Sequence, residues 1–398
     1  MSFSLKRLLS HDDILLLQGK MGTFFCRFAT FLMEQGKTVR KINFNAGDAF
    51  FYCHKDKMDN YRGTLADFEQ FLGEYVKKHH IKAVVCFNDC RPYHEIAKVV
   101  CQRLGLAFFV FEEGYLRPDY ITLEEYGING YSRFDPKLIH TLKKAKDKPK
   151  FTDNRFYRLC VAAAVYYIAV FVGAWRYPHY EHYRGLSIWA EAWAWIKAPF
   201  RKVARRYPDK RLQDTLVGQK NFYLVSLQVH NDSQISHHSD YADVRDFITE
   251  VLTSFAKFAP KETVILFKHH PLDRGHRDYT RLLKRTAHEL GITGRVFYGC
   301  DMHLPSLIRA SIGMVTVNST TALQSIYHRK PTKIMGRALY DVAGLTDQKH
   351  LNAFWGDPTV PDREFYLKFR EYLIEQTQLN GSFYGTSPWV LAYQNTNQ

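Results

Sequence analysis

The stretch AFFVFEEG, residues 107–114, contains the features from which the fold and chemistry of this chain can be inferred. Its first five residues are a continuous apolar run, which is typical of a strand buried on both faces of a parallel sheet. Glu112 and Glu113 end this run, and Gly114 permits a sharp turn after them. Because successive strand side chains point to opposite faces, we expect one carboxylate to face a site and the other to brace the loop.

Short apolar runs of the same kind recur through the first half of the chain, at 14–17, 39–44 and 83–87. Helical patterns separate them, which predicts a parallel α/β sheet. Ligands of such sheets bind at the carboxyl ends of the strands. We therefore expect sugar or acceptor contacts from the residues that follow these runs and from the arginine after the acidic pair: Gly19, Gly22, Asn43, Asn45, Asn88 and Arg117.

The second half repeats the alternation, with strands predicted at 222–227, 264–267, 296–298, 314–317 and 332–335. Two Rossmann-like halves facing each other across a cleft form the GT-B architecture of many sugar transferases. Cations, hydroxyls and backbone amides at strand ends suit a phosphate. The candidate donor-binding residues are Lys268, His269, His270, Ser319, Thr320, Thr321, Gln228, Asn231 and Asp232.

Each group also has a structural interpretation that the sequence leaves open. Glu112 and Glu113 are equally well explained as solvated carboxylates, and a histidine before Pro271 can cap the helix predicted there. One hydroxyl of 319–321 is expected only to cap a helix, and the polar loop 228–234 is equally a simple turn. We expect no metal site, because the sequence has neither a DxD nor an HExxH motif.

Residues 137–215 fit neither half. The segment 136–220 has 18 lysines and arginines and 6 acidic residues, a net charge of +12 within a total of +15. It includes an apolar run at 159–175 and a tryptophan-rich stretch that ends in basic residues. This composition indicates helices that lie in a membrane interface, and the alternative is a helical hairpin packed on the protein.

The predicted organisation has four parts. Residues 1–136 form a Rossmann-like domain with the acceptor site and the catalytic carboxylate, and 137–215 form the membrane-associating insertion. Residues 216–375 form a second Rossmann-like domain for the donor, and 376–398 form a tail or helix that packs back on the first domain. The seven scattered cysteines and the lack of a signal peptide predict reduced thiols in a cytosolic protein. No nucleic-acid partner is expected, because the basic residues lie beside a long apolar run.

Six stretches resemble the capsule polysaccharide transferase family, and together they cover both halves: QGKMGTFFCRFATFL, KINFNAGD, FEEGYLRPDY, LQVHNDSQI, KHHPLDRG and VNSTTALQSIYHRKPTKIMG. The resemblance implies a GT-B fold without a catalytic metal or other cofactor. It maps a proposed nucleophile, an Asp in other members, onto Glu113, and leaves open whether Glu112 faces the cleft instead. It maps the donor-phosphate contacts onto His270, Ser319 and Thr320.

The resemblance further implies the donor CMP-Kdo, the acceptor phosphatidylglycerol or its lyso form, and retaining transfer of the first β-Kdo of a capsular glycolipid linker. Expected partners are capsule assembly and export proteins, including a chain-extending Kdo transferase. The expected location is cytoplasmic, on the inner face of the cytoplasmic membrane. The alternatives are another CMP-sugar transferase of the sialyl type, since bacterial sialyltransferases share two of the motifs, and a non-catalytic membrane scaffold of capsule export. If Glu113 acted only as a base, the product would be inverted.

Overall fold

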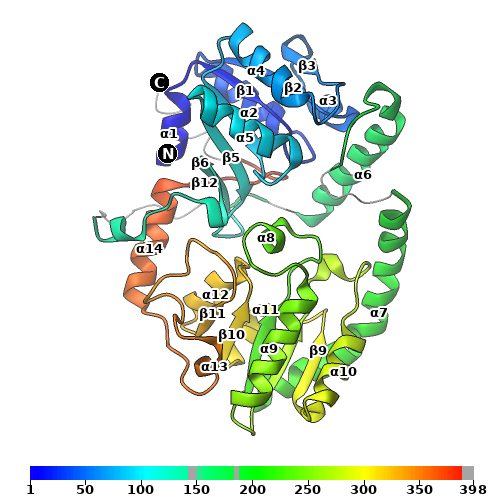
Figure 1. Cartoon of the computed structure of the whole chain (residues 1–398), viewed down its shortest axis with the longest axis vertical. Coiled ribbons are helices and arrows are strands. Elements are labelled where there is room, and N and C mark those ends of the chain that lie inside the picture. Colours follow the sequence, from blue (N-terminus) through cyan, green and yellow to red (C-terminus); the bar gives the residue numbers. More distant parts are fainter. Residues whose placement is uncertain (142–149, 154, 183–187, 388–398) are drawn as a thin grey trace. The chain divides into compact units, whose positions relative to one another are not determined.

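The computed structural model describes residues 1–141, 150–153, 155–182 and 188–387 (Figure 1). The chain divides into two compact units. The first comprises Met1–Tyr183 together with Arg370–Gln398, and the second comprises Arg184–Phe369. Each has its own sheet and hydrophobic core.

The first unit is built on a seven-stranded sheet in the order β12-β6-β5-β4-β1-β2-β3. Strands β1 to β5 are parallel, whereas β6 and β12 extend the edge in antiparallel pairing. The strands are β1 (Asp13–Leu16), β2 (Thr38–Asn43), β3 (Met58–Asn60), β4 (Ala83–Phe87), β5 (Ala107–Glu113), β6 (Tyr120–Glu125) and β12 (Gln378–Asn380). The helices are α1 (Phe3–Leu9), α2 (Phe24–Glu34), α3 (Ala46–Phe51), α4 (Phe68–Lys78), α5 (Pro92–Leu104) and α6 (Phe156–Val172).

Helices cover both faces of this sheet, which explains the unbroken apolar run of β5. Phe109 and Phe111 belong to the core formed with α1 and α2, whereas Phe108 and Val110 belong to the core formed with α4 and α5. The alternation of side chains along one strand thus supplies two cores.

The second unit has a five-stranded parallel sheet in the order β9-β8-β7-β10-β11. Its strands are β7 (Phe222–Ser226), β8 (Val264–Lys268), β9 (Val296–Gly299), β10 (Gly313–Thr316) and β11 (Thr332–Ile334). Its helices are α7 (Ile188–Gln219), α8 (Ser233–Ser236), α9 (Val244–Phe258), α10 (Thr280–Glu289), α11 (Leu304–Ala310), α12 (Thr321–Tyr327) and α13 (Leu351–Phe354). Helix α14 (Arg363–Gln376) leads from the second unit into the C-terminal part of the first.

Both parallel sheets have the Rossmann strand order 3-2-1-4-5, which confirms the predicted composition of two Rossmann-like domains that defines the GT-B class. The strand order reverses between β1 and β4 in the first unit and between β7 and β10 in the second. Ligands of such sheets bind at the carboxyl ends of the strands beside this switch point.

The predicted insertion is not a separate domain, because its two helices belong to different units. Helix α6 packs on α3 in the first unit, where the ring of Tyr166 covers Gly47. Helix α7 packs in the second unit, where Asp209 accepts hydrogen bonds from the amides of Cys300 (2.8 Å) and Asp301 (2.7 Å). No helix among the described residues has the length and apolar character needed to cross a membrane.

The prediction that all thiols are reduced is wrong for one pair. Cys26 of α2 and Cys53, just after α3, form a disulfide. The other five cysteines, Cys86, Cys90, Cys101, Cys160 and Cys300, are free thiols. The local sequence did not indicate this pair because the two residues are 27 positions apart and meet only when α2 and α3 pack.

Candidate functional site

Glu113 lies at the carboxyl end of β5, where its side chain is 32% exposed. Its Oε1 forms an ion pair with the ammonium of Lys20, which the loop after β1 carries. Burial alone would raise the pKa of Glu113, but the charges of Lys20 and Arg117 outweigh burial and lower it. Glu113 is therefore an ionised, partly accessible carboxylate at neutral pH.

Glu112 does not share the contacts of Glu113; its carboxylate instead supports the end of β5. Its Oε2 accepts a hydrogen bond from Nδ2 of Asn88 (3.1 Å), and its Oε1 accepts one from the backbone amide of Glu113 (2.9 Å). The predicted division of labour between the two carboxylates is thus present, with Glu112 bracing the strand end that presents Glu113.

Several residues predicted to contact the sugar or acceptor have structural roles instead. Asn43 is fully buried and donates to Asn60 Oδ1 (3.2 Å). Asn45 caps α3, accepting from the Asp48 amide (2.9 Å). Asn88 supports Glu112 and accepts the Cys90 amide on Oδ1 (3.0 Å). Sequence position placed these asparagines at strand ends, but each side chain satisfies nearby backbone or buried groups.

The loop between β1 and α2 approaches its neighbours closely at both predicted glycines. A Cβ atom on Gly19 would lie 2.7 Å from the Phe25 ring, and Gly22 has a φ of +106°, which favours glycine. Arg117 is exposed, and its Nε donates to the carbonyl of Gly114 (3.2 Å), so it holds the turn after Glu113 as well as lowering the pKa of that carboxylate.

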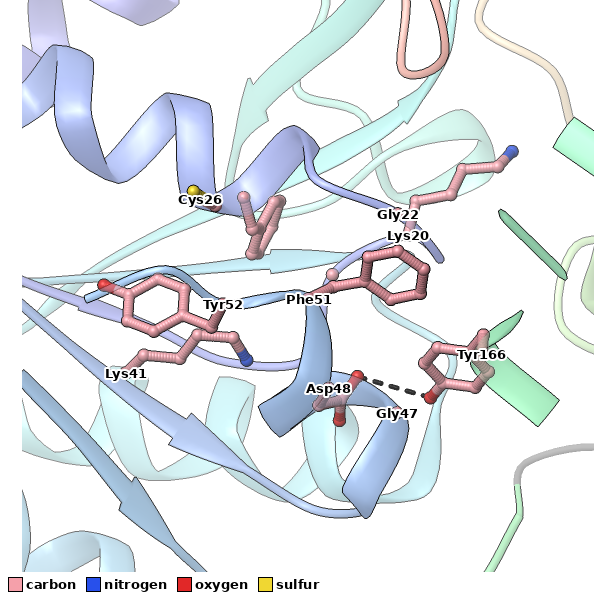
Figure 2. Close-up of a pocket in the computed structure, with 11 residues that line it drawn as sticks. Lys20, Gly22, Cys26, Lys41, Gly47, Asp48, Phe51, Tyr52 and Tyr166 are labelled. Carbon is pink, nitrogen blue, oxygen red and sulfur yellow. Dashed lines mark hydrogen bonds between the residues drawn. The ribbon is translucent and has the colours of Figure 1, made fainter. Parts of the chain in front are cut away.

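A small pocket beside this loop connects it to α6 (Figure 2). Asp48 lies between Lys41 and Tyr166, and accepts hydrogen bonds from the Tyr166 hydroxyl (3.3 Å) and from Gln18 Nε2 (3.1 Å). Burial raises the pKa of Asp48 and lowers that of Lys41 to about 8. Lys41 donates to the carbonyls of Leu17 and Ile42 (both 3.3 Å). The hydrogen bonds of Asp48 and Gln18 with Tyr166 therefore attach α6 to the loop that carries Lys20.

In the second unit, the lysine and the first histidine of the KHHPLDRG motif, Lys268 and His269, are directed inward. Lys268 is buried and donates to the carbonyl of Cys300 (3.3 Å), and burial lowers its pKa. His269 is also buried, with Nε2 3.2 Å from Asp273 Oδ2 and Nδ1 2.6 Å from the Tyr298 hydroxyl. Both side chains are thus paired with interior groups, and their direct contact with a donor stays a prediction.

Asp273 organises this region, although the sequence did not single it out. Its Oδ1 lies 2.5 Å from His230 Nδ1, and its Oδ2 contacts His269. Burial would raise the pKa of Asp273, but the hydrogen bonds to the two histidines hold it well below the usual value. This carboxylate joins the loop after β7 to the loop after β8.

His270 is partly exposed and caps a short turn. Its Nδ1 accepts the Leu272 amide (3.2 Å) at the start of the 3₁₀ turn Pro271–Asp273. The predicted α-helix at Pro271 is wrong, since α10 begins only at Thr280, so no helix N-terminus supports a phosphate there. The Nδ1 contact agrees with the alternative interpretation, in which the histidine before Pro271 caps the turn that follows.

The loops after β7 and β10 meet at the switch point of the second sheet. Gln228 Nε2 donates to Asn318 Oδ1 (2.9 Å), and the Asn318 amide donates back to Gln228 Oε1 (3.3 Å). Gln228, predicted to contact the donor, is buried and joins the two loops through these hydrogen bonds. Asn231 and Asp232 lie partly buried in the turn before α8, in agreement with the polar-turn alternative.

The three hydroxyls after β10 have different surroundings. Ser319 Oγ accepts the Thr321 amide (3.3 Å) and the Thr321 hydroxyl (3.0 Å), and Thr321 also reaches Ser226 Oγ (3.4 Å) at the end of β7. The prediction that one hydroxyl serves only to cap fits Ser319. Thr320 is partly exposed and its side chain makes no capping hydrogen bond. Thr320 therefore presents a partly exposed side chain at the switch point, whereas Ser226 is buried and its Oγ accepts the Thr321 hydroxyl.

Sequence reasoning missed Lys20, Ser226, His230 and Asp273. Lys20 stands between the two glycines already singled out, and Asp273 lies inside the KHHPLDRG motif, so both had a local signal. Ser226 and His230 flank Gln228 and gave none, because their relevance depends on neighbours from other strands.

Comparison with known proteins agrees with these motifs. Residues 82–384 match the family model described as capsule polysaccharide biosynthesis protein. The capsule polysaccharide modification protein LipB of Neisseria meningitidis is 43% identical over 393 residues, covering 94% of this chain and 92% of LipB. The capsule polysaccharide export protein KpsS of Escherichia coli is 39% identical over 383 residues, covering 95% and 98%.

Among solved structures, the Thermosulfurimonas dismutans KpsC beta Kdo 2,7 transferase aligns with a TM-score of 0.45 at 11% identity, over 96% of this chain and 99% of that one. The family model spans both the acidic motif and the second-unit loops described above. The chain belongs to the capsule polysaccharide biosynthesis protein family.

Proposed function

We propose that the protein is a retaining β-Kdo glycosyltransferase that transfers the first Kdo from CMP-Kdo to phosphatidylglycerol or its lyso form, beginning the poly-Kdo linker of a capsular glycolipid. Family membership supports a role in capsule synthesis. The observation that carries the chemistry is Glu113, a carboxylate held ionised by Lys20 at the carboxyl end of β5. Its Oε2 accepts no hydrogen bond from any described residue, so this oxygen is available to react.

In the proposed reaction, Glu113 Oε2 forms a bond to the anomeric carbon while the bond from that carbon to the phosphate oxygen of CMP breaks. The electron pair leaves with CMP. The acceptor hydroxyl oxygen then attacks the same carbon, Glu113 leaves as a carboxylate, and the hydroxyl proton is released to water. Two inversions give net retention. In the second unit, Thr320 and His270 are the groups proposed to bind the phosphate of CMP, so the proposal invokes no metal.

A trapped intermediate provides the direct test. Intact-protein mass spectrometry after incubation with CMP-Kdo is expected to show one added Kdo on the wild type and none on Glu113→Gln. Glu112→Gln is the matched control. It should lower turnover by loosening the strand end, but should still form the adduct. An adduct on Glu113→Gln, or an inverted product linkage by NMR, would contradict the nucleophilic role.

Offering several donors with a fluorescent phosphatidylglycerol separates the proposal from its alternatives. Transfer only from CMP-sialic acid would identify a sialyl-type enzyme. No transfer from any CMP-sugar, with intact folding, would favour a non-catalytic scaffold of capsule export. We further propose partners in capsule assembly, including a chain-extending Kdo transferase that uses the product.

A lipid acceptor requires contact with the membrane, and α6 offers an exposed apolar face for it. This face is defined by Tyr157, Val161, Ile168, Phe171 and Val172 of α6 and by Trp175 of the 3₁₀ turn Ala174–Arg176 that follows, all 56% to 75% exposed. It lies opposite Tyr166, which anchors α6 to the first unit. Arg155 and Arg176 flank the helix, as expected for a helix on an anionic surface. We propose that the protein is bound peripherally at the inner face of the cytoplasmic membrane.

A further inference from the structure

Lys20 lies beside Glu113, the carboxylate proposed to react, and neighbouring side chains fix its position. Its side chain is 15% exposed, and within the part of the chain that the structure describes its one ion-pair partner is Glu113 Oε1. The loop fits closely at Gly19, where a Cβ atom would lie 2.7 Å from the Phe25 ring, and Gly22 contacts Ala162 and Tyr384 at ordinary van der Waals distance.

Three aromatic rings surround the Lys20 ammonium. Nζ lies 4.9 Å from the centre of the Phe87 ring, 5.3 Å from that of Phe383 and 5.9 Å from that of Tyr384. Ring faces attract a cation, and Phe383 is itself buried against Phe24 and Phe87. The rings therefore fix the position of the ammonium beside Glu113.

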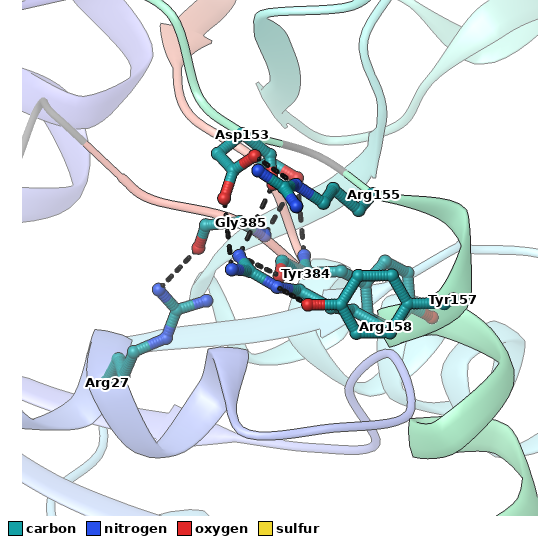
Figure 3. Close-up of polar contacts among 8 residues, drawn as sticks. Arg27, Asp153, Arg155, Tyr157, Arg158, Tyr384 and Gly385 are labelled. Carbon is teal, nitrogen blue, oxygen red and sulfur yellow. Dashed lines mark hydrogen bonds and ion pairs between the residues drawn. The ribbon is translucent and has the colours of Figure 1, made fainter.

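The C-terminal segment that supplies two of these rings is held by arginines of α2 and α6 (Figure 3). Arg27 donates to the carbonyls of Gly385 (2.9 Å) and Phe383 (3.2 Å), and Arg158 donates to the carbonyl of Tyr384 (3.5 Å). The amide of Thr386 donates to the carbonyl of Thr152 (2.8 Å). The position of Lys20 thus depends on contacts that extend over the whole first unit.

We propose that Lys20 is the residue that selects acidic sugars, binding the carboxylate of a 2-ulosonic acid donor when Glu113 becomes esterified. This rests on the proposed function. In Kdo and in sialic acids the carboxylate is bonded to the anomeric carbon, the atom that Glu113 attacks. Formation of the ester removes the charge of Glu113 and leaves the ammonium without its counter-ion. The sugar carboxylate, one bond from the reacting carbon, then replaces it.

Comparing acid and ester donors on the wild type and on Lys20 variants tests this role. CMP-Kdo and its carboxyl methyl ester are compared on the wild type, Lys20→Met and Lys20→Arg, with CMP-sialic acid and its ester as a second donor pair. The wild type is expected to prefer the acid roughly hundredfold in kcat/KM, because an ester leaves the partly buried ammonium without a carboxylate partner. Lys20→Met should lose most of the activity on the acid and show no preference between acid and ester. Lys20→Arg should keep part of both.

Lys37→Met is the control, since it removes another lysine ion pair of the first unit, with Asp12. Its kcat/KM and acid preference should match the wild type. If Lys20→Met, folded by its thermal unfolding curve, keeps the wild-type preference for the acid, Lys20 does not read the carboxylate. If the wild type transfers neither sugar, the proposed function fails and this assignment fails with it. The two failures are therefore distinguished by the wild-type reaction alone.

Discussion

At the scale of single residues, Glu124 gives the clearest pH prediction. This buried side chain of β6 accepts hydrogen bonds from the Tyr115 hydroxyl (2.7 Å) and the Ser132 hydroxyl, and burial raises its pKa to about 7. The folded state therefore binds more protons than the unfolded state between about pH 4.5 and 7, and its stability falls as pH rises through this window. Glu124→Gln removes the ionisation.

Relative to the wild type, Glu124→Gln is expected to gain about 2 kcal/mol of unfolding free energy between pH 5 and pH 8, at about 1.4 kcal/mol per pKa unit. Urea unfolding followed by circular dichroism at both pH values measures this gain. Glu69→Gln, which removes a carboxylate that is 47% exposed, should follow the wild type at both pH values. An equal gain in both variants would show that Glu124 does not titrate in this window.

The acidic pair of β5 shows how far a site can be located from the sequence. The alternation of a strand predicts that Glu112 and Glu113 diverge, and the structure agrees. Which of them reacts depends on Asn88 and Lys20, which other strands bring to the same edge. The asparagines at the strand ends were predicted to bind ligand, but the sequence does not show that Asn45 caps its own helix.

At the scale of elements, the packing of α6 against α3 depends on one glycine of α3, Gly47. A Cβ atom at Gly47 would lie 2.7 Å from the ring of Tyr166, closer than such atoms approach. Gly47→Ala is therefore expected to destabilise the first unit by about 1–3 kcal/mol through overpacking. Gly73→Ala in α4 is the matched control. Its Cβ would meet only Arg103 Nη2 at 3.9 Å, so it should stabilise by up to about 1 kcal/mol. Thermal unfolding of both variants measures the difference, and a stabilising Gly47→Ala would show that α6 and α3 are not closely packed there.

The elements that the sequence did not predict are those set by distant pairing. The parallel strands of both units followed from their apolar runs, except β3, which has none. The antiparallel strands β6 and β12 were also missed, because their pairing joins Thr122 to Gln378, and local periodicity carries no information about a partner that far away. Likewise, composition grouped α6 and α7 into one insertion, but they belong to different units. Helix α6 packs against α3, whereas Asp209 of α7 accepts hydrogen bonds from backbone amides of the second unit.

At the scale of the whole molecule, charge and exposed apolar surface coincide in the same part of the chain. Helix α7 has its own exposed apolar stripe, formed by Trp193, Ile196, Phe200, Val203 and Tyr207. Residues 136–220, which include both helices, have a net charge of +12. The proposed reaction joins a soluble donor to a lipid acceptor, and both properties favour binding to an anionic membrane surface.

Flotation with phosphatidylglycerol vesicles tests this membrane contact. The variant Ile168→Ser, Phe171→Ser, Trp175→Ser replaces three side chains that are 63% to 75% exposed, so it should fold normally. It should bind roughly a thousandfold more weakly, since each large apolar side chain contributes about 1.5 kcal/mol when buried. The control Phe258→Ser, Val360→Ser removes exposed apolar side chains elsewhere and should bind like the wild type. High salt should weaken wild-type binding, because it screens the basic residues. Unchanged binding by the α6 variant would exclude this face as the contact, and salt-independent binding to neutral vesicles would exclude the electrostatic contribution.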